Sequence, residues 1–255
     1  MSGFLNRSLV KKYWMAATGL FLCLFLVGHV SGNLQLLIPG YEGKLQFNEY
    51  AVFMTSNPAV KILSYLTYFS IIFHVIDGIL LTRANKKARP QGYVYNKPQR
   101  NSIWSSRNMG VLGTIILVFI VFHMQDFWYE YKFGEIPYMV SEQGHPITKS
   151  GEVVVDGVIN SETAKVIKNG EVAGLAMKDL HEEVMEAFQV PWIVIVYVIS
   201  MIAIAFHLWH GFSSAFQSIG INHDKYTPII KKAGYAFAVV IPLLFAIIPV
   251  IIYLK

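Results

Sequence analysis

Charged residues are scarce in this chain, and cysteine is almost absent. Only 15% of the 255 residues are charged, and the single cysteine, Cys23, excludes a disulfide within the chain. The charges also avoid several stretches of about 20 residues, the length that an α-helix needs to cross roughly 30 Å of hydrocarbon. Together with a hydrophobic fraction of 54%, this distribution indicates a multi-pass membrane protein.

Five apolar stretches are long enough to span a membrane. The sequence therefore predicts an all-α membrane protein, a bundle of five transmembrane helices that forms a single domain over residues 1–255. The expected helices cover approximately residues 13–31, 60–82, 109–128, 192–212 and 233–254. The first stretch is too long for the apolar region of a signal peptide and lacks a small-residue cleavage site after it, so we expect it to remain as a helix.

Basic residues gather on one side of this predicted bundle. The N-terminus, the second connection and the fourth connection hold thirteen of the 21 Lys and Arg residues, and the positive-inside rule places such segments in the cytoplasm. The N-terminus is therefore expected inside and the C-terminus outside. The third connection, residues 130–190, has eleven acidic residues against five lysines and is predicted to be an external insertion. The net charge of +5 is then an asymmetry across a membrane, and no nucleic-acid partner is expected.

Two connections carry patterns of their own. In the insertion, ITKSGEVVVDGVIN (147–160) alternates like a hairpin and MKDLHEEVMEAF (177–188) has helical periodicity. The insertion either caps an external site or is inert. The basic connection, residues 83–107, contains no acidic residue, and Pro90 and Pro98 argue against a continuous helix through it. It is either a docking surface for partner subunits or a run of charge that only fixes the topology.

Four of the predicted helices carry a histidine within the apolar stretch. His29 and His123 lie about 24 and 22 Å from the cytoplasmic ends of their helices, in the outer half, whereas His74 and His207 lie in the inner half. The expected pairs are therefore His29 with His123 and His74 with His207, in layers on the order of 10 Å apart. A lone intramembrane histidine is more often a polar contact to a neighbouring helix. Two level pairs favour haem, because a six-coordinate haem iron requires one imidazole above the ring and one below it.

A glycine follows each inner histidine by one helical turn. FHVIDG (73–78) and FHLWHG (206–211) place Gly78 and Gly211 on the histidine face, where a missing side chain leaves room for a flat macrocycle. This glycine also favours His207 over His210 as the ligand. Zinc fits less well, because cysteine or carboxylate co-ligands are absent at matching depth.

Other polar residues leave alternatives open. Asp77 and His210 each follow a proposed ligand by three residues, and they either form an ion pair or turn separately toward water. The remaining histidines fall in polar connections and are expected to be solvated; they are His145, His181 and His223.

An ordered set of motifs resembles the di-haem cytochrome b membrane subunit of succinate dehydrogenases and fumarate reductases. The motifs are YWMAATGLFLCLFLVGHVSGN (13–33), FNEYAVFMTSNP (47–58), FHVIDG, VFHMQDFW (121–128) and FHLWHGFSSAFQSIGI (206–221). They cover the first four helices, and the fifth matches by position. The resemblance implies a subunit of the bacterial cytoplasmic membrane that anchors a flavoprotein and an iron–sulfur subunit at the cytoplasmic face. It would pass electrons between their clusters and a membrane quinone through two b haems.

The resemblance also assigns residues. It implies that His74 and His207 hold the haem nearer the cytoplasm and that His29 and His123 hold the outer haem. Glu49 roughly matches a carboxylate that accepts protons in menaquinol-oxidising members, so menaquinone is the expected quinone. A partly buried glutamate with a raised pKa would suit this task, whereas a solvated loop carboxylate is the alternative, and Asp126 is a second candidate.

The chain would thus be the quinone-reactive subunit of an enzyme whose dicarboxylate chemistry lies in partner chains. Two rival functions remain. One is a di-haem cytochrome b of another reductase or of a hydrogenase, and the other is a haem-free membrane transporter or scaffold.

Overall fold

The computed structural model describes residues 8–88, 97, 100 and 102–255. Helices make up 72% of the structure. Within the described residues, five helical segments are long and apolar enough to cross a membrane, namely Leu9–Leu37, Pro58–Ala88, Met109–Phe133, Pro191–Ser218 and Thr227–Tyr253. The prediction of a mostly helical, multi-pass membrane protein is therefore confirmed.

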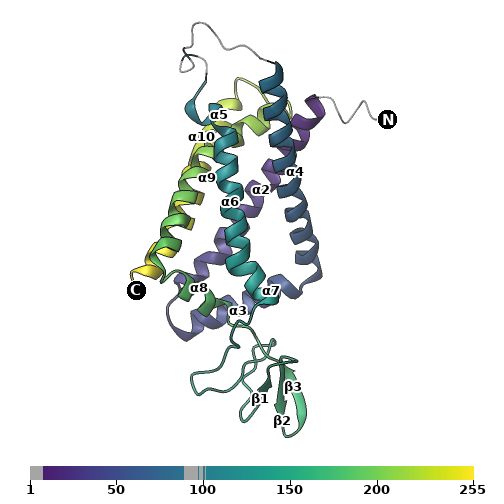
Figure 1. The fold of residues 1–255 in the computed structure, drawn as a ribbon, viewed down its shortest axis with the longest axis vertical. Coiled ribbons are helices and arrows are strands. Elements are labelled where there is room, and N and C mark those ends of the chain that lie inside the picture. The colour runs from purple at the N-terminus through teal and green to yellow at the C-terminus, as the bar shows by residue number, and fades with distance from the viewer. Residues whose placement is uncertain (1–7, 89–96, 98–99, 101) are drawn as a thin grey trace, which may run out of the picture. The chain divides into compact units, whose positions relative to one another are not determined.

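The long helices of these segments are α2 (Ser8–Asn33), α4 (Pro58–Ala88), α6 (Met109–His123), α9 (Pro191–Ser218) and α10 (Thr227–Tyr253), labelled in Figure 1. Most run beyond the apolar stretches that predicted them, because a helix need not end where its apolar residues end. Pro58 and Pro191 open α4 and α9, where the fixed φ of proline suits the first turn and its missing N–H costs nothing. The side chain of Asn57 accepts hydrogen bonds from the amides of Ala59 and Val60 and so caps α4.

The third spanning segment changes its helical form after His123. A π-helical stretch, η3 (Met124–Tyr129), follows α6 directly, and α7 (Glu130–Phe133) continues from it. A π-helical turn is rare and is found often at functional sites. Sequence periodicity predicted a helix over this segment without distinguishing its type.

The chain divides into two compact units. Unit 1 contains residues 1–30, 63–120 and 196–246, and unit 2 contains residues 31–62, 121–195 and 247–255. Unit 1 holds most of α2, α4, α6, α9 and α10. One of its cores is formed by the buried residues Cys23, Leu208 and Ala238, which come from three of these helices.

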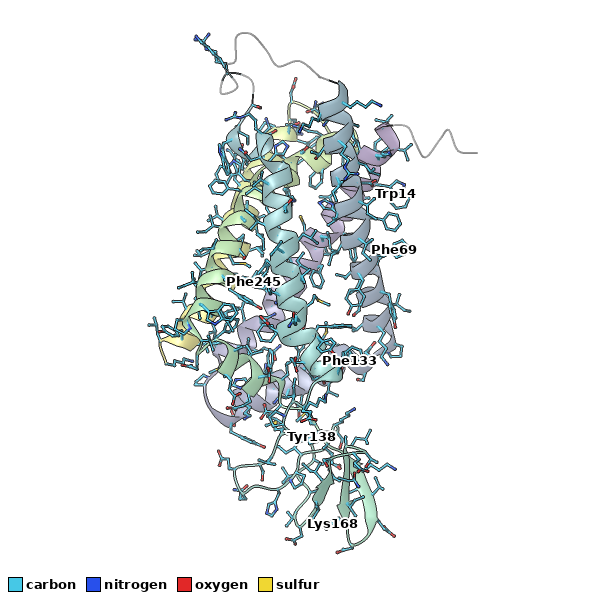
Figure 2. All side chains as sticks on the ribbon, viewed as in Figure 1. Trp14, Phe69, Phe133, Tyr138, Lys168 and Phe245 are labelled. Atoms are coloured by element: carbon cyan, nitrogen blue, oxygen red, sulfur yellow. The ribbon has the colours of Figure 1, made fainter. Side chains whose placement is uncertain are left out.

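Large apolar side chains remain exposed on the spanning helices of unit 1. Trp14 is 55% exposed and Phe69 is 62% exposed, and Figure 2 shows both pointing away from the helices that carry them. Such exposure is expected where lipid tails replace water as the surrounding medium.

Unit 2 contains a helix that the sequence did not predict. The connection after α2 forms a short 3₁₀ turn, η1 (Leu34–Leu37), and then the 17-residue helix α3 (Gly40–Ser56). Gly32, at the end of α2, allows a close approach to α3, because a Cβ built there would lie 2.5 Å from the hydroxyl oxygen of Tyr50. FNEYAVFMTSNP therefore lies on a helix for most of its length.

The 130–190 segment, also in unit 2, has secondary structure of its own. Strands β1 (Val158–Asn160), β2 (Lys165–Lys168) and β3 (Glu171–Leu175) form an antiparallel sheet in the order β1-β2-β3 (Figure 1). Asn169 and Gly170, both with positive φ, form the turn between β2 and β3, as Asn-Gly does in tight hairpins.

Both patterns predicted for this segment have a counterpart in the structure. The helical periodicity of 177–188 is confirmed by α8 (Leu180–Ala187). The stretch expected to form a hairpin does so over a short length: Ile147 and Val153 form an antiparallel bridge, and the amides of Thr148 and Val154 donate to the carbonyls of Glu152 and Pro146. The three strands of the sheet lie after residue 157.

The basic connection is described in part. Helix α4 continues through Arg83, Lys86 and Lys87, and the short helix α5 (Trp104–Arg107) precedes α6. Pro90 and Pro98 lie outside the described residues.

Candidate functional site

His74 of α4 and His207 of α9 face each other within unit 1. Their ring centroids are 6.1 Å apart and their planes are inclined by 64°. Two imidazoles that bind one metal from opposite sides have centroids about 6 Å apart, because each metal–nitrogen bond is about 2 Å and each ring adds about 1 Å. This predicted pair is therefore brought together at the spacing of two axial ligands.

The hydrogen bonding of His74 leaves one of its nitrogens available. Nδ1 of His74 lies 3.3 Å from Oγ1 of Thr18 on α2, and the Thr18 hydroxyl donates its own hydrogen to the carbonyl of Trp14 at 2.7 Å. Oγ1 must then accept from the N–H at Nδ1. In the neutral ring this tautomer has its lone pair on Nε2, the nitrogen through which the ring could bind a metal.

His207 carries a buried nitrogen without a protein partner. Among the described residues, no donor or acceptor reaches its Nδ1, which is shielded from solvent. A buried polar atom left unpaired costs about 1–3 kcal/mol, so such an atom requires an explanation in terms of a ligand or a functional role. A neutral ring bound to a metal through Nε2 would carry its hydrogen on this Nδ1, where no protein acceptor is found among the described residues.

The glycines next to these rings are only partly the expected ones. A Cβ built on Gly19 of α2 would lie 3.2 Å from Cε1 of His74, and one on Gly113 of α6 would lie 3.8 Å from Cε1 of His207. Gly78 and Gly211 face flexible side chains instead: their built Cβ atoms meet the methyl groups of Met15 at 3.6 Å and Met109 at 3.9 Å.

These contacts belong to one arrangement that occurs twice. On α2, Met15 and Gly19 pack against Gly78 and His74 of the antiparallel helix α4. On α6, Met109 and Gly113 pack in the same way against Gly211 and His207 of α9. Two helix pairs thus present one histidine each from matching positions.

The repeat extends along α2 and α6. Both helices carry the pattern M-x3-G-x5-F-x3-H, which ends at His29 in α2 and at His123 in α6. Each residue of the pattern on α2 therefore has an equivalent residue at the same place in the pattern on α6. Sequence reasoning singled out the histidines but missed Gly19 and Gly113, which this repeat would have revealed, and Thr18, which has no equivalent threonine on α6.

His29 and His123 belong to different units. In unit 1, the ring of His29 lies 5.3 Å from the ring of Phe25 and 5.4 Å from that of Phe245 on α10 (labelled in Figure 2). In unit 2, the ring of His123 lies 5.6 Å from that of Phe127 in the π-helical stretch. The pairing of His29 with His123 stays a prediction.

The structure gives Asp77 different neighbours from the one considered in the sequence. Asp77 is buried on α4, and the charged groups acting on it are Lys11 of α2 and His74. His210 has no such interaction with it, since burial is the cause that acts on that ring. Of the two alternatives left open by the sequence, an ion pair between Asp77 and His210 is not found among the described residues.

Glu49 is exposed on α3, in unit 2, and neither the partly buried site nor the loop expected for it is found. A Cβ built on Gly151 would lie 2.6 Å from Oε1 of Glu49, so a turn of the 130–190 segment approaches this carboxylate closely. The turn is closed by a hydrogen bond from the amide of Gly151 to the carbonyl of Thr148, and Gly151 has a φ of 82°. Glu49 is thus on a helix, and it lies beside the 130–190 segment, which the sequence predicts to be external like Glu49 itself.

Asp126, the second candidate for proton transfer, lies in the π-helical stretch η3.

A polar network that the sequence did not indicate holds the 130–190 segment to α3. Asp179 is 4% exposed and accepts from Nδ2 of Asn48 at 2.8 Å, while Oδ1 of Asn48 accepts from the amide of His181. Lys44 pairs with Asp179 at 2.7 Å and with Glu182 at 2.6 Å. The segment is therefore docked on α3 by buried hydrogen bonds.

His181 is half-buried rather than fully solvated as expected. Its ring packs edge-on against Phe47 at 6.0 Å, and its Nδ1 is shielded without a partner among the described residues. Burial lowers its pKa, whereas the nearby Asp179 works in the opposite direction. For Lys44, burial disfavours the charge, but the hydrogen bonds to Asp179 and Glu182 prevail and raise its pKa.

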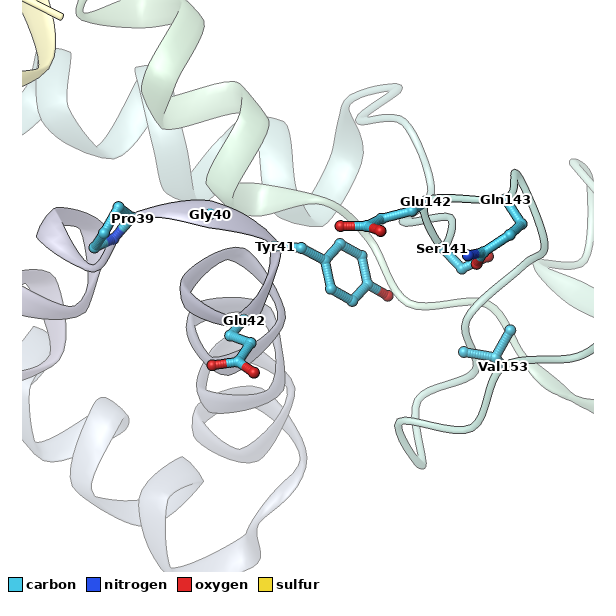
Figure 3. Close-up of a pocket in the computed structure, with 8 residues that line it drawn as sticks. All are labelled: Pro39, Gly40, Tyr41, Glu42, Ser141, Glu142, Gln143 and Val153. Atoms are coloured by element: carbon cyan, nitrogen blue, oxygen red, sulfur yellow. The ribbon is translucent and has the colours of Figure 1, made fainter.

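An open pocket of about 490 Å³ lies between the start of α3 and the 141–143 turn, both in unit 2. Figure 3 shows the ring of Tyr41 projecting between these segments, with Glu142 and Ser141 on the far side. Burial and the neighbouring Glu142 raise the pKa of Tyr41. None of the residues predicted to bind a cofactor lines this pocket.

No family model matches the chain, and neither a curated protein nor a solved structure matches it. Among the described residues, no group of three or more His, Cys, Asp or Glu side chains gathers to hold a bare metal ion. The candidate site therefore rests on the paired histidines and the helices that present them.

Proposed function

We propose that this chain is the di-haem cytochrome b membrane subunit of a succinate:quinone or quinol:fumarate oxidoreductase. The observation that carries the proposal is the His74–His207 pair, with ring centroids 6.1 Å apart on facing helices. The repeated helix pattern supports a second site, because it places His29 and His123 at equivalent positions on α2 and α6.

The chain's own residues have distinct tasks in this proposal. His74 and His207 would hold the inner haem, and His29 and His123 the outer one. Bound haem iron would carry single electrons across the membrane. Gly19 and Gly113 would keep the helix backbones close to the inner histidine rings, and Oγ1 of Thr18 lies 3.3 Å from Nδ1 of His74. Glu49 would take up protons at the outer face, where quinol oxidation releases them.

The topology belongs to the same proposal. Basic residues at the N-terminus and after α4 support a cytoplasmic location for these segments, where flavoprotein and iron–sulfur subunits would dock. The C-terminus and the 130–190 segment would then lie outside the bacterial cytoplasmic membrane. Docked on α3 and approaching Glu49 through Gly151, that segment is suited to cover a quinone site, for which menaquinone is the expected substrate.

Purification of the chain from membranes tests the proposal. Two low-spin b haems per chain, seen in a reduced-minus-oxidised spectrum, and co-purification of a flavoprotein and an iron–sulfur protein are expected. Two haems with other partner subunits would indicate the cytochrome b of another reductase or of a hydrogenase. A chain without haem would leave a transporter or scaffold whose histidines are polar contacts.

A further inference from the structure

The two histidines of the inner pair differ in how their Nδ1 atoms are partnered. Nδ1 of His74 is 3.3 Å from the Thr18 hydroxyl, whereas Nδ1 of His207 is buried and has no hydrogen-bond partner among the described residues. Two axial ligands that are alike in residue type are thus unlike in their surroundings.

The repeat of helices α2 and α6 explains this difference. Thr18 directly precedes Gly19, and the residue that directly precedes the matching Gly113 is Leu112. Leu112 is 4% exposed and has no polar atom in its side chain. A hydroxyl beside one histidine is therefore replaced by an apolar side chain at the equivalent position beside the other.

The direction of the Thr18 hydrogen bond is set by its geometry. The hydroxyl hydrogen goes to the carbonyl of Trp14 at 2.7 Å, with a longer approach of 3.2 Å to the carbonyl of Met15. Only acceptor capacity remains on Oγ1, so Nδ1–H of His74 donates to it. The Met15 carbonyl is a second acceptor near the same ring.

We propose that Thr18 is a positioning residue, which fixes the ligating tautomer of His74 and makes this imidazole the more strongly electron-donating of the two inner ligands. An acceptor on the N–H of a metal-bound histidine raises the basicity of the ligand. A more basic ligand stabilises the oxidised metal, so the hydrogen bond lowers the reduction potential of the haem. The inference rests on the proposed function.

The first test is a potential measurement on the purified holoprotein. Thr18→Val should raise the midpoint potential of the haem that His74→Ala removes, and Thr18→Ser should restore it. Leu112→Thr, which supplies a hydroxyl beside His207, should lower it. Thr114→Val is the matched control, because the Thr114 hydroxyl on α6 bonds to the carbonyl of Gly110, one turn back, in the same way. An unchanged potential in Thr18→Val, or an equal shift in Thr114→Val, would overturn the proposal.

The second test needs no haem. In haem-free protein labelled with ¹⁵N-histidine, the signal lost in His74→Ala should be that of a ring protonated on Nδ1, and Thr18→Val should increase the tautomer protonated on Nε2. An unaltered tautomer would refute the role of Thr18. A chain that binds no haem would refute the proposed function, while this readout would still decide about Thr18.

Discussion

Units 1 and 2 satisfy their polar side chains in opposite ways. In unit 1, hydroxyls on the spanning helices bond to the carbonyl four residues back, as Thr67 does to Leu63 and Ser200 to Val196. In unit 2, the buried Asn48 bonds across the fold to Asp179, 131 residues away, and the half-buried Lys44 bonds to Glu182, 138 residues away.

This difference follows from the surroundings of each unit. In hydrocarbon no water compensates for a polar group that loses its partner, so bonds within a helix are the safest choice. The inner histidines depart from this rule, because His74 bonds to another helix and Nδ1 of His207 has no partner among the described residues. The comparison teaches that Asn48 and Lys44 of unit 2 hold distant segments together, whereas His74 and His207 of unit 1 carry ring nitrogens that do not bond within their own helix.

The largest effect should come from removing a ligand in unit 1. His207→Ala or His74→Ala should abolish the inner haem, because one imidazole cannot maintain a six-coordinate iron. His29→Ala or His123→Ala should remove the outer haem and leave the inner one largely intact. Haem content and reduced-minus-oxidised spectra measure both outcomes, with His223→Ala, an exposed histidine after α9, as the control. Retention of both haems in His207→Ala would break the assignment.

The next effect would show that unit 2 carries chemistry as well as structure. Glu49→Gln keeps the size of the side chain but removes its proton affinity. We expect quinol oxidation to fall by about 100-fold or more, as for the loss of a general base, while dithionite still reduces both haems. Glu42→Gln, on the same helix and also exposed, is the matched control. Unchanged turnover in Glu49→Gln would return this residue to the role of a solvated carboxylate.

A smaller effect is expected from cutting the network that docks the 130–190 segment. Asn48→Ala removes a partner of the buried Asp179 and of the His181 amide, and it should destabilise unit 2 by about 2–4 kcal/mol. Limited proteolysis of residues 135–190 measures the effect, and the spectrum of the haem that His74 and His207 would hold reports on unit 1. Gln46→Ala, at an exposed position of α3, serves as the control. Loss of that haem before the segment becomes cleavable would contradict the division of tasks between the units.

The spanning helices of unit 1 could be predicted because each depends on local sequence. A run of about 20 apolar residues must form a helix in a membrane, where every backbone group needs a partner within its own segment. The pairing of His74 with His207 followed from the depth of each residue in its helix. Thr18 and Gly19 were missed, because their roles depend on which face of α2 meets α4.

Unit 2 was harder to predict because it depends on distant contacts. Helix α3 has no pronounced apolar stripe, and its buried Asn48 is explained only by Asp179 and His181, more than 130 residues later. Predicting a solvated His181 failed for the same reason, since its neighbour Phe47 belongs to α3. An ion pair between Asp77 and His210 is not found among the described residues, because two residues at matching positions on two helices need not face each other.

The smallest expected effect is a dependence of unit 2 on pH. Burial lowers the pKa of His181 below its ordinary value of 6.5. The unfolded chain therefore binds the proton more tightly, so this stability is present above about pH 6.5 and is lost as the pH falls toward the folded pKa. Lys44 acts at alkaline pH. Its pKa is raised above the ordinary value of 10.5, so the stability that it contributes is lost only as the pH rises above 10.5.

Between pH 7 and 5 we expect the thermal midpoint of unit 2 to fall, because the unfolded chain takes up a proton that the folded unit binds less tightly. Protease resistance of residues 135–190 on heating gives this midpoint. His181→Gln should flatten the acid side of the profile, because the residue that gains a proton on unfolding is gone. His223→Gln removes an exposed histidine and should leave the profile unchanged. Equal slopes in the His181→Gln variant and the native chain would show that burial of this ring does not couple unit 2 to pH.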